Sequence, residues 1–339
     1  RDRARERKAR VRRRAPAEGD DEEGGQAGNQ FALVPVKPPA PLLPSGLSEL
    51  AAARTLQEVL RPISEGLAGF RTHEQQQRAL QEVAEVLMNH WDLLIVGRRH
   101  FIVEMEAYVH SPSHKDPYTE GHAGQLQCAA WYFKRRGDTF KTGNLKGLDL
   151  ACGGGRGSAV HAGLLLRSIV DEDEEEFTEG SSCVVDKILK LSKKANVTKF
   201  VAGRAVAQLP AESVAELRMA RATTHRKDRV WAAPRTGLTL RGKDSDSLPM
   251  KGNPVAFCTR AYRFSTRPSR LHKLRSGFAA SLRAVGRLEA DADLGMSQKK
   301  LEAFSQAVDA GMKHSDPWRF LNKTIATQHE MCELVGACQ

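Results

Sequence analysis

The alternation of apolar and polar residues predicts a β-sheet in the middle of the chain. Residues 101–109 alternate with a period of two, which sends one set of side chains inward and the other outward in an extended strand. Other apolar runs of strand length share this character. They cover residues 93–96, 131–133, 147–150, 163–169, 230–238 and 255–265. We therefore expect residues 93–265 to contain the successive strands of one sheet.

Helical spacing of apolar residues appears on both sides of this region. Residues 45–89 predict two helices divided by Arg61-Pro62, because proline interrupts a helix. Residues 182–195 form an amphipathic pattern with lysines at its end, where the helix dipole favours positive charge. Residues 271–339 show weaker helical periodicity. The pattern predicts an α+β fold, with a single mixed domain over 45–275 and a helical extension over 276–339.

The first 44 residues are too polar and too charged to contribute to a core. Residues 1–14 hold nine Lys/Arg and two acids, a local charge of +7, so only +4 of the formal net charge of +11 remains for the other residues. We predict that 1–44 form a disordered tail. The arginine-rich run could be a nuclear-import signal, an arm that binds phosphates, or a passive extension. We expect a nuclear protein, with an organelle as the alternative.

Composition narrows the class of protein. The 339 residues are 40% hydrophobic, which is enough for a core, and we expect a monomer. Six cysteines occur without a Cys-x-x-Cys pair and without metal-site spacing to histidine, which indicates free thiols, a reducing compartment and no metal site. No run of about 18 apolar residues is present, so we expect no membrane span.

The strand over 101–109 also carries candidate chemistry. Glu106 and Tyr108 are two residues apart and therefore share one face of the strand, where a carboxylate beside an aromatic ring could hold a planar ligand. Arginines gather near the later strand-like runs. Three of these, Arg235, Arg260 and Arg263, are candidates for binding DNA phosphates, and the alternative is that they are ordinary surface arginines.

A glycine-rich stretch allows two interpretations. Residues 148–157 resemble the first motif of Rossmann-type S-adenosylmethionine-dependent methyltransferases, in which a strand ends in an acid and glycines let the backbone approach a ligand. Asp171 lies near the place of a second, ribose-binding acid. However, parallel strands need a crossover of a dozen or more residues, and 158–163 is too short for it. A glycine-rich loop between two apolar runs more naturally joins antiparallel strands.

A second resemblance extends over about residues 83–275 and involves five segments in order. Val103-Glu104-Met105-Glu106-Ala107-Tyr108 resembles the Val-Glu-x-Glu-Ala-Tyr strand of the alkyladenine (3-methylpurine) DNA glycosylase family. The other segments are 163–167, 181–191, 235–238 and 260–264, which resemble the family's Leu-Leu-Arg strand, a helix and its two closing strands. The resemblance implies a single domain with a curved, mainly antiparallel sheet flanked by helices.

The resemblance also implies an activity without a cofactor. Such enzymes bind double-stranded DNA, rotate a damaged purine, alkylated or deaminated, out of the duplex, and hydrolyse its N-glycosidic bond with water. In this chain Glu106 would activate the water and Arg167 would hold Glu106 and the water in place. Tyr108 would stack on the base. Tyr132, or else Trp131, would supply a second aromatic ring.

The remaining base-binding positions depart from the family pattern. His122, or else His114, would replace a pocket histidine, because Glu120 follows the acidic loop where a histidine is expected. Asp149 stands in place of the asparagine that screens bases. A second carboxylate near Glu106 would raise the pKa of one of them and could inactivate the base. Three functions therefore stay open: an active glycosylase, a catalytically silent nucleic-acid-binding relative, and a methyltransferase.

Overall fold

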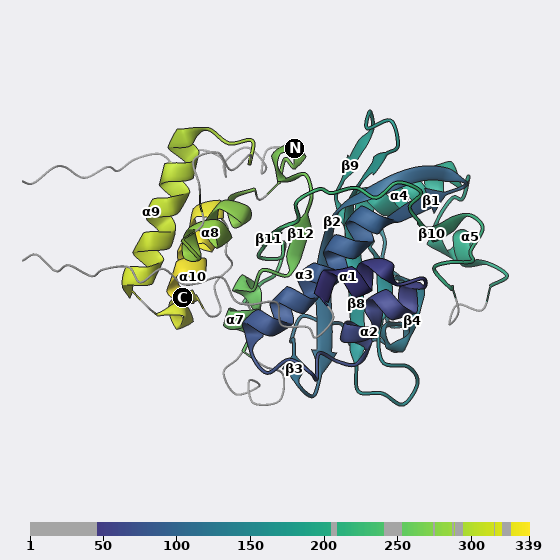
Figure 1. The fold of residues 1–339 in the computed structure, drawn as a ribbon, viewed down its shortest axis with the longest axis horizontal. Coiled ribbons are helices and arrows are strands. Elements are labelled where there is room, and N and C mark those ends of the chain that lie inside the picture. Colours follow the sequence, from purple (N-terminus) through teal and green to yellow (C-terminus); the bar gives the residue numbers. More distant parts are fainter. Residues whose placement is uncertain are drawn as a thin grey trace, which may run out of the picture. The chain divides into compact units, whose positions relative to one another are not determined.

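Antiparallel strands dominate the middle of the chain in the computed structural model of this protein (Figure 1). The structure describes residues 46–204, 209–240, 253–273, 275–286, 288, 294–314, 316–320 and 327–339. The predicted tail over residues 1–44 lies outside these described residues, and so does part of the predicted extension over 276–339. The described residues form a mixed α+β domain, which confirms the predicted fold class.

The main sheet has ten strands among the described residues. They are β1 (Trp91–Ile95), β2 (Arg98–Ser111), β3 (His114–Lys115), β4 (Cys128–Phe133), β7 (Leu148–Cys152), β8 (His161–Asp171), β9 (Phe177–Glu179), β10 (Leu217–Arg221), β11 (Trp231–Ala233) and β12 (Arg263–Ser265). The order is β10-β1-β2-β8-β7-β4, with β11-β12 and β3 paired to β2 and with β9 paired to β8. A small hairpin, β5 (Arg135–Arg136) and β6 (Thr139–Phe140), extends the connection between β4 and β7.

Strands β7 and β8 are antiparallel neighbours. Asp149 lies opposite Leu165 and Ala151 lies opposite Gly163, and the residues between the strands contain no helix. This confirms the expectation that 149–169 is not a strand-helix-strand crossover. The glycine-rich stretch is a loop between antiparallel strands, so it does not form the strand-to-helix turn that binds a dinucleotide or a cosubstrate in a Rossmann-type fold.

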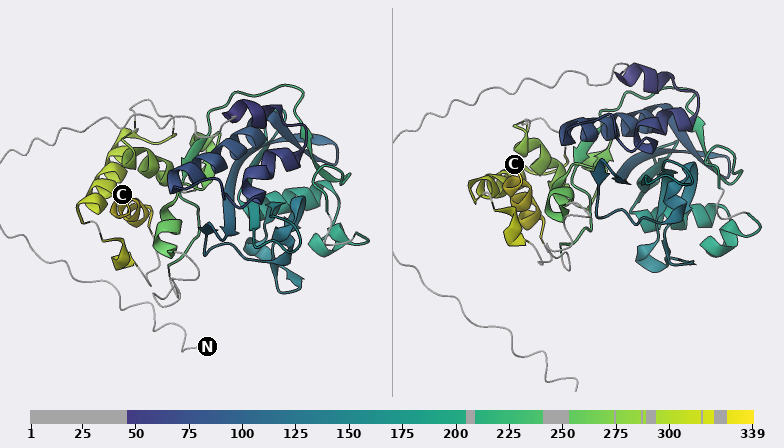
Figure 2. Two further views of the ribbon diagram at one scale, coloured as in Figure 1. Left: turned by 60° about the horizontal axis from the view of Figure 1, so that its bottom comes forward. Right: turned by 90° about the horizontal axis from the view of Figure 1, so that it is seen from below.

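Helices cover the sheet and follow it. In chain order they are α1 (Gly46–Ala52), α2 (Leu56–Ser64), α3 (His73–His90), α4 (Ser181–Leu191), α5 (Val197–Val201), α7 (Pro254–Thr259), α8 (Ser276–Ala284), α9 (Gln298–His314) and α10 (Gln328–Ala337). Capping boxes begin α2 and α3, where Thr55 and Thr72 accept hydrogen bonds from backbone N–H groups of the first turn. Both views of Figure 2 show α1–α3 together on one side of the sheet.

Two local predictions were wrong. Pro62 lies inside α2 instead of ending it, and the helix continues to Ser64. Residues 254–259 form α7 and not the start of a strand, because Asn253 caps the segment and Pro254 occupies the first turn, where a missing N–H costs nothing. The apolar run at 255–258 has no periodicity that separates a buried helix turn from a strand.

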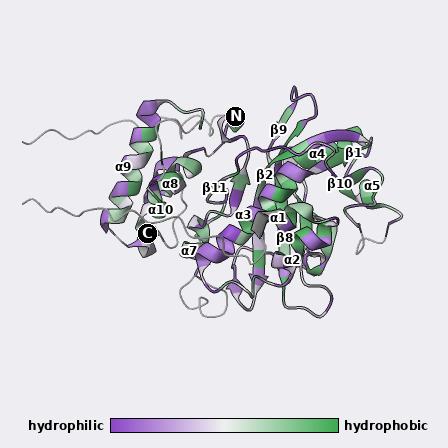
Figure 3. Cartoon of the chain, viewed as in Figure 1, coloured by the Kyte–Doolittle hydropathy of each residue, from purple (hydrophilic) through white to green (hydrophobic). Residues whose placement is uncertain are grey.

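The two faces of strand β2 have different surroundings. Met105, Ala107 and Val109 point into the main core together with the apolar faces of α2 and α3. Figure 3 shows that the strands, like the long helices, carry both hydrophobic and hydrophilic residues. The alternate residues of β2, which include Glu106 and Tyr108, lie on the opposite face. That face contains the candidate site.

The C-terminal helices α8, α9 and α10 pack on one another, and α8 also contacts β11. Helices α9 and α10 approach closely because both carry glycine at the contact. A Cβ atom on Gly311 would lie 2.0 Å from the carbonyl oxygen of Glu333, and one on Gly336 would lie 2.0 Å from that of Val308. The boundary at residue 275 between a domain and an extension stays a prediction. No helix within the described part of the chain is long and apolar enough to cross a membrane.

Candidate functional site

Strand register places the candidate residues in one row across the sheet. Tyr132 on β4 pairs with Asp149 on β7, and Asp149 pairs with Leu165 on β8. Leu165 in turn pairs with Glu106 on β2, and Glu106 pairs with Arg263 on β12. Directly opposed residues in antiparallel strands point to the same face. The row, together with Tyr108 on the same face, is called the site face below.

Glu106 lies at the centre of the site face and is fully buried. Its Oε1 accepts hydrogen bonds from the backbone N–H of Thr236 at 2.7 Å and from the Thr236 hydroxyl at 3.0 Å. Its Oε2 accepts the hydroxyl of Tyr108 at 2.8 Å. The guanidinium of Arg167 lies 3.5 Å from Oε1. The structure therefore brings Glu106, Tyr108 and Arg167 together, as the sequence resemblance implied.

A second buried carboxylate, Glu104, binds the same nitrogen of Arg167. Its Oε1 accepts from Arg167 at 3.1 Å and from Arg263 at 2.6 Å, and its Oε2 accepts the hydroxyl of Ser168. Burial alone would raise the pKa of Glu104, but the charges of Arg263 and Arg167 outweigh burial and lower it. Glu104 therefore stays ionised and fixes the orientation of Arg167.

A β-bulge brings Arg167 to this position. Between β2 and β8, Glu104 pairs with Ser168 and the next residue, Met105, pairs with Leu166, so Arg167 has no opposite partner. An extra residue on one strand bends it and redirects its side chains, and bulges are frequent near functional sites. Here the bulge lets both Arg167 and Ser168 reach the same carboxylate.

Two cations lie against the ring of Tyr108. The guanidinium carbon of Arg235 is 4.5 Å from the ring centroid, and the ammonium of Lys134 is 4.8 Å from it. Burial and the neighbouring charge of Glu106 raise the pKa of the Tyr108 hydroxyl, so it stays protonated and donates. Lys134 thus occupies space beside the ring that a stacked base would need.

The structure corrects the expected phosphate contacts. Arg235 is 1% exposed and binds both oxygens of Asp116, at 2.6 and 3.1 Å. Arg263 is also 1% exposed and is paired with Glu104. Buried, ion-paired arginines cannot reach a DNA backbone. Arg260 is half-buried, with one nitrogen 2.5 Å from Nε2 of His73, so none of the three lies free at the surface.

Asp149 is fully buried in the row, two strands from Glu106, with Leu165 between them. The side-chain N–H of Gln125 donates to its Oδ2 at 3.3 Å, and Lys134 lies 3.9 Å from its Oδ1. Burial raises the pKa of Asp149, and the charge of Lys134 opposes that rise. Gly163 makes room for this side chain, because a Cβ atom there would lie 2.8 Å from Oδ2.

His122 and Tyr132 form a stacked pair next to Asp149. Their ring centroids are 5.1 Å apart with planes tilted by 25°. The Tyr132 hydroxyl donates to Glu120 at 3.3 Å, and Glu120 also pairs with Lys141. Burial lowers the pKa of His122, which favours the neutral ring. The two rings therefore lie at the Asp149 end of the row.

The alternatives to these two residues lie elsewhere. Trp131 points into the core, and its indole N–H donates to the carbonyl of Leu217 at 2.9 Å. His114 is buried, with its Nδ1 2.8 Å from Gln76, and burial lowers its pKa to about 3. The structure therefore favours Tyr132 over Trp131 and His122 over His114 as residues of the site face.

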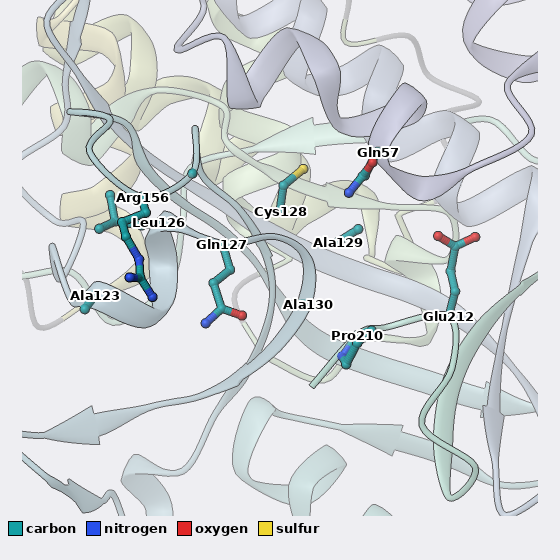
Figure 4. A pocket seen from close by; sticks show the side chains of 11 residues that line it. Gln57, Ala123, Leu126, Gln127, Cys128, Ala129, Ala130, Arg156, Pro210 and Glu212 are labelled. Carbon is teal, nitrogen blue, oxygen red and sulfur yellow. The ribbon is translucent and has the colours of Figure 1, made fainter. Parts of the chain in front are cut away.

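A separate pocket of about 610 Å³ is lined in part by the short helix η1 (Ala123–Leu126), and Figure 4 shows its lining side chains. Its lining combines apolar side chains with Arg156, Glu212 and two glutamines. Ala123 and Leu126 line this pocket, whereas Gln125 on the same helix turns to Asp149. The candidate residues of the site face do not line the pocket.

Several contacting residues had no assigned role in the sequence interpretation. Thr236 lies in the segment 235–238, which resembles a closing strand of the family. Nothing in that segment indicates that the backbone N–H and the hydroxyl of Thr236 both bind Glu106. Lys134 and Gln125 carry no sequence signal and are brought in by the tertiary structure. Glu104 could have been found, because it is two residues from Glu106 and shares its face of the strand. Within the described residues, no group of three or more metal-binding side chains converges.

Comparisons with known proteins give little guidance on this site. No family model matches the chain. One similar protein is the uncharacterized protein L759 of Acanthamoeba polyphaga mimivirus, which is 24% identical over 181 residues. The match covers 50% of this chain and 83% of the viral protein. The assignment of function therefore depends on the residues of the site.

Proposed function

We propose that this chain is a base-excision enzyme of the alkyladenine DNA glycosylase type, which hydrolyses the N-glycosidic bond of a damaged purine in duplex DNA. The observation that carries the proposal is the buried Glu106, held by Tyr108, Arg167 and Thr236 in one row with Asp149. A buried carboxylate with an adjacent arginine and an aromatic ring is suited to position a water molecule beside a stacked base.

In the proposed reaction, Glu106 removes a proton from water as the water oxygen attacks the sugar carbon of the glycosidic bond. The base leaves with the bonding electrons: a cationic alkylated purine becomes neutral, whereas hypoxanthine leaves as an anion and takes a proton from solvent water. Arg167 keeps Glu106 oriented. General-base assistance of this kind contributes roughly 10²–10⁴-fold to a rate. Tyr108 supplies the stacking surface once Lys134 moves away from the ring.

The DNA contacts must come from exposed basic residues. The hairpin β5–β6 follows β4 directly and carries Arg135 and Arg136, and Arg136 is exposed. Arg135 stacks on Phe140 at 4.1 Å from the ring centroid. We propose this hairpin as the phosphate-binding element, in place of the buried Arg235 and Arg263. A nuclear or organellar location and a monomeric state remain predictions.

One observation favours a silent relative that binds DNA without excision. Both oxygens of Glu106 already accept hydrogen bonds, three in all, and the side chain is fully buried. A general base needs a free lone pair directed at water. Catalysis would therefore require the Thr236 hydroxyl to turn away from Oε1, whereas a silent relative would keep the arrangement as it is.

The test is incubation of the purified chain with duplexes that contain hypoxanthine or an alkylated purine, scored for abasic sites. We expect release by the wild-type protein and none by Glu106→Gln, which keeps the shape of the side chain and removes the base. Glu106→Gln should still bind the duplexes. Release by neither protein, with binding intact, would support the silent relative and contradict the enzyme.

A further inference from the structure

Two buried acceptor atoms, one on the site face and one on η1, have no hydrogen-bond partner. Asp149 Oδ1 and Gln125 Oε1 are inaccessible to solvent, and neither accepts a hydrogen bond within the described residues. Both side chains are 0% exposed. The two residues contact each other, because the Gln125 N–H donates to the other oxygen of Asp149. Burying an acceptor without a donor is costly, so such pairs indicate a site that is completed by a ligand.

A cation, Lys134, lies close to this pair. Its ammonium lies 3.9 Å from Asp149 Oδ1, which is beyond hydrogen-bond distance, and 4.8 Å from the centroid of the Tyr108 ring. The ammonium also lies 3.9 Å from Glu120, to which it could turn. Lys134 therefore lies between the ring of Tyr108 and the unpartnered Oδ1 of Asp149.

From these contacts we infer that the site face selects a purine whose edge presents adjacent N–H donors, which is the guanine type with a ring N–H and a 2-amino group. This inference rests on the proposed function and names its class of base. Stacking on Tyr108 would place the purine edge at Asp149, which accepts two parallel N–H groups, with Gln125 Oε1 as an additional acceptor. Among the ordinary bases, guanine alone presents two adjacent donors of this kind.

The pKa of Asp149 depends on what lies at this edge. Burial raises the pKa of Asp149, and the charge of Glu120 adds to the rise, whereas Lys134 and Lys141 oppose it. Donation of two N–H groups to a carboxylate favours its charged form. A ligand with an acceptor at that edge would instead face the lone pairs of Asp149 and leave them unsatisfied. The site would therefore reject a purine edge without donors.

The test compares two duplexes that differ by one amino group, with 7-methylguanine or 7-methylhypoxanthine opposite cytosine. Affinities are measured with the Glu106→Gln protein, so that no base is lost during titration. We expect the amino-bearing duplex to bind tighter by about tenfold or more. One good bidentate contact discriminates between two bases by about this factor. Adding Asp149→Asn should bring the two affinities close to equality, because one oxygen becomes an N–H₂ donor that opposes the amino group.

Matched controls separate this effect from a loss of folding. Asp186→Asn removes an exposed carboxylate, which is paired with Lys146, and should leave the preference unchanged. Equal affinities for the two duplexes, or a preference that survives Asp149→Asn, would overturn the inference. Affinities no greater than for an unmodified duplex would overturn it as well.

Base release by the wild-type protein from the same duplexes distinguishes the inference from the proposed function. An amino-dependent binding preference without release would support the edge assignment and contradict the enzyme. Release of both bases, with equal binding of the two duplexes, would support the enzyme and contradict the edge assignment. Competition by free deoxyguanosine over deoxyinosine would support recognition of the free nucleoside. Competition by neither, with the duplex preference intact, would support recognition only within nucleic acid.

Discussion

Glu104 and Glu106 are two residues apart on one strand, yet their surroundings give them different roles. Glu104 lies between the guanidinium groups of Arg263 and Arg167, and these charges fix it as an ionised structural group. Glu106 is held mainly by the neutral hydroxyl and amide donors of Tyr108 and Thr236. Neutral donors can turn away more easily than a buried ion pair can be broken. Glu106 is therefore the carboxylate suited to react.

The first residue-scale prediction concerns Glu104→Gln. Removing this charge leaves Arg263 and Arg167 without their common partner, and breaking such a buried pair costs roughly 3–5 kcal/mol of unfolding free energy. The measurement is chemical denaturation at neutral pH. Glu172→Gln is the control, because Glu172 is half-exposed and pairs with Arg99, and we expect a change within about 0.5 kcal/mol. A loss of the same size in both variants would contradict the prediction.

The difference in stability between wild type and Glu104→Gln should also depend on pH. The pKa of Glu104 is lowered from its ordinary value of 4.5, so its charge stabilises the fold above that value. This contribution disappears as the pH falls through the folded-state pKa, because the native carboxylate must then be protonated. The stability difference between wild type and Glu104→Gln should therefore shrink below pH 4.5. A difference that is constant from pH 7 to pH 3.5 would be incompatible with this cause.

A second residue-scale prediction separates the ring of Tyr108 from its hydroxyl. Tyr108→Ala should weaken binding to a damaged duplex by about 1–3 kcal/mol, the usual value of one base-aromatic stack, and barely change binding to an undamaged one. Tyr108→Phe keeps the ring and serves as the control for binding. Fluorescence titration of both duplexes measures the effect. If Tyr108→Ala bound every duplex as wild type does, the stacking role would be excluded.

At the scale of elements, the glycine-rich loop acts as a clamp on η1. The N–H of Gly153 donates to the carbonyl of Gln127 at 2.7 Å, and that of Gly155 donates to Leu126 at 2.7 Å. These bonds hold η1 so that Gln125 faces Asp149. The glycines thus serve close backbone approach within the protein. The run of glycines in the sequence indicates a close backbone contact, but it does not show which segment makes that contact.

This role predicts the effect of Gly153→Ala. A Cβ atom there would lie 2.1 Å from the carbonyl oxygen of Gln125, so the backbone of η1 must shift. Overpacking of this kind costs about 1–3 kcal/mol, and the shift should also disturb Asp149. Thermal unfolding measures the cost. Gly69→Ala is the matched control, because nothing lies within 4 Å of the added carbon, and equal effects at both positions would refute the clamp.

Element types were predictable where a period was clear. The alternation over 101–109 identified β2, and the antiparallel turn between β7 and β8 followed from the short connection. Prediction failed where sequence patterns are ambiguous. Residues 254–259 look like a strand but are capped as a helix, and Pro62 is accommodated within α2. Side-chain capping and tertiary packing, which a local pattern does not contain, decided both cases.

At the scale of the whole molecule, charge is distributed unevenly. Residues 1–14 carry +7 of the net +11. If they bind phosphates, deleting residues 1–14 should weaken binding to any duplex and flatten its salt dependence, by roughly one unit of slope for each phosphate that the tail had neutralised. Replacing their arginines by glutamine keeps the length and should have the same effect. An unchanged slope in both variants would leave the tail a targeting signal or a passive extension.

The sequence by itself determined the strand that carries Glu106 and Tyr108, the α+β class and the antiparallel connection of β7 to β8. These features follow from periodicity and connection length, which are local. Only the tertiary structure decided that Arg235 and Arg263 are buried and that Lys134 and Gln125 complete the site face. Charge alone does not reveal whether an arginine faces solvent or a buried carboxylate, because its partner lies more than a hundred residues away along the chain.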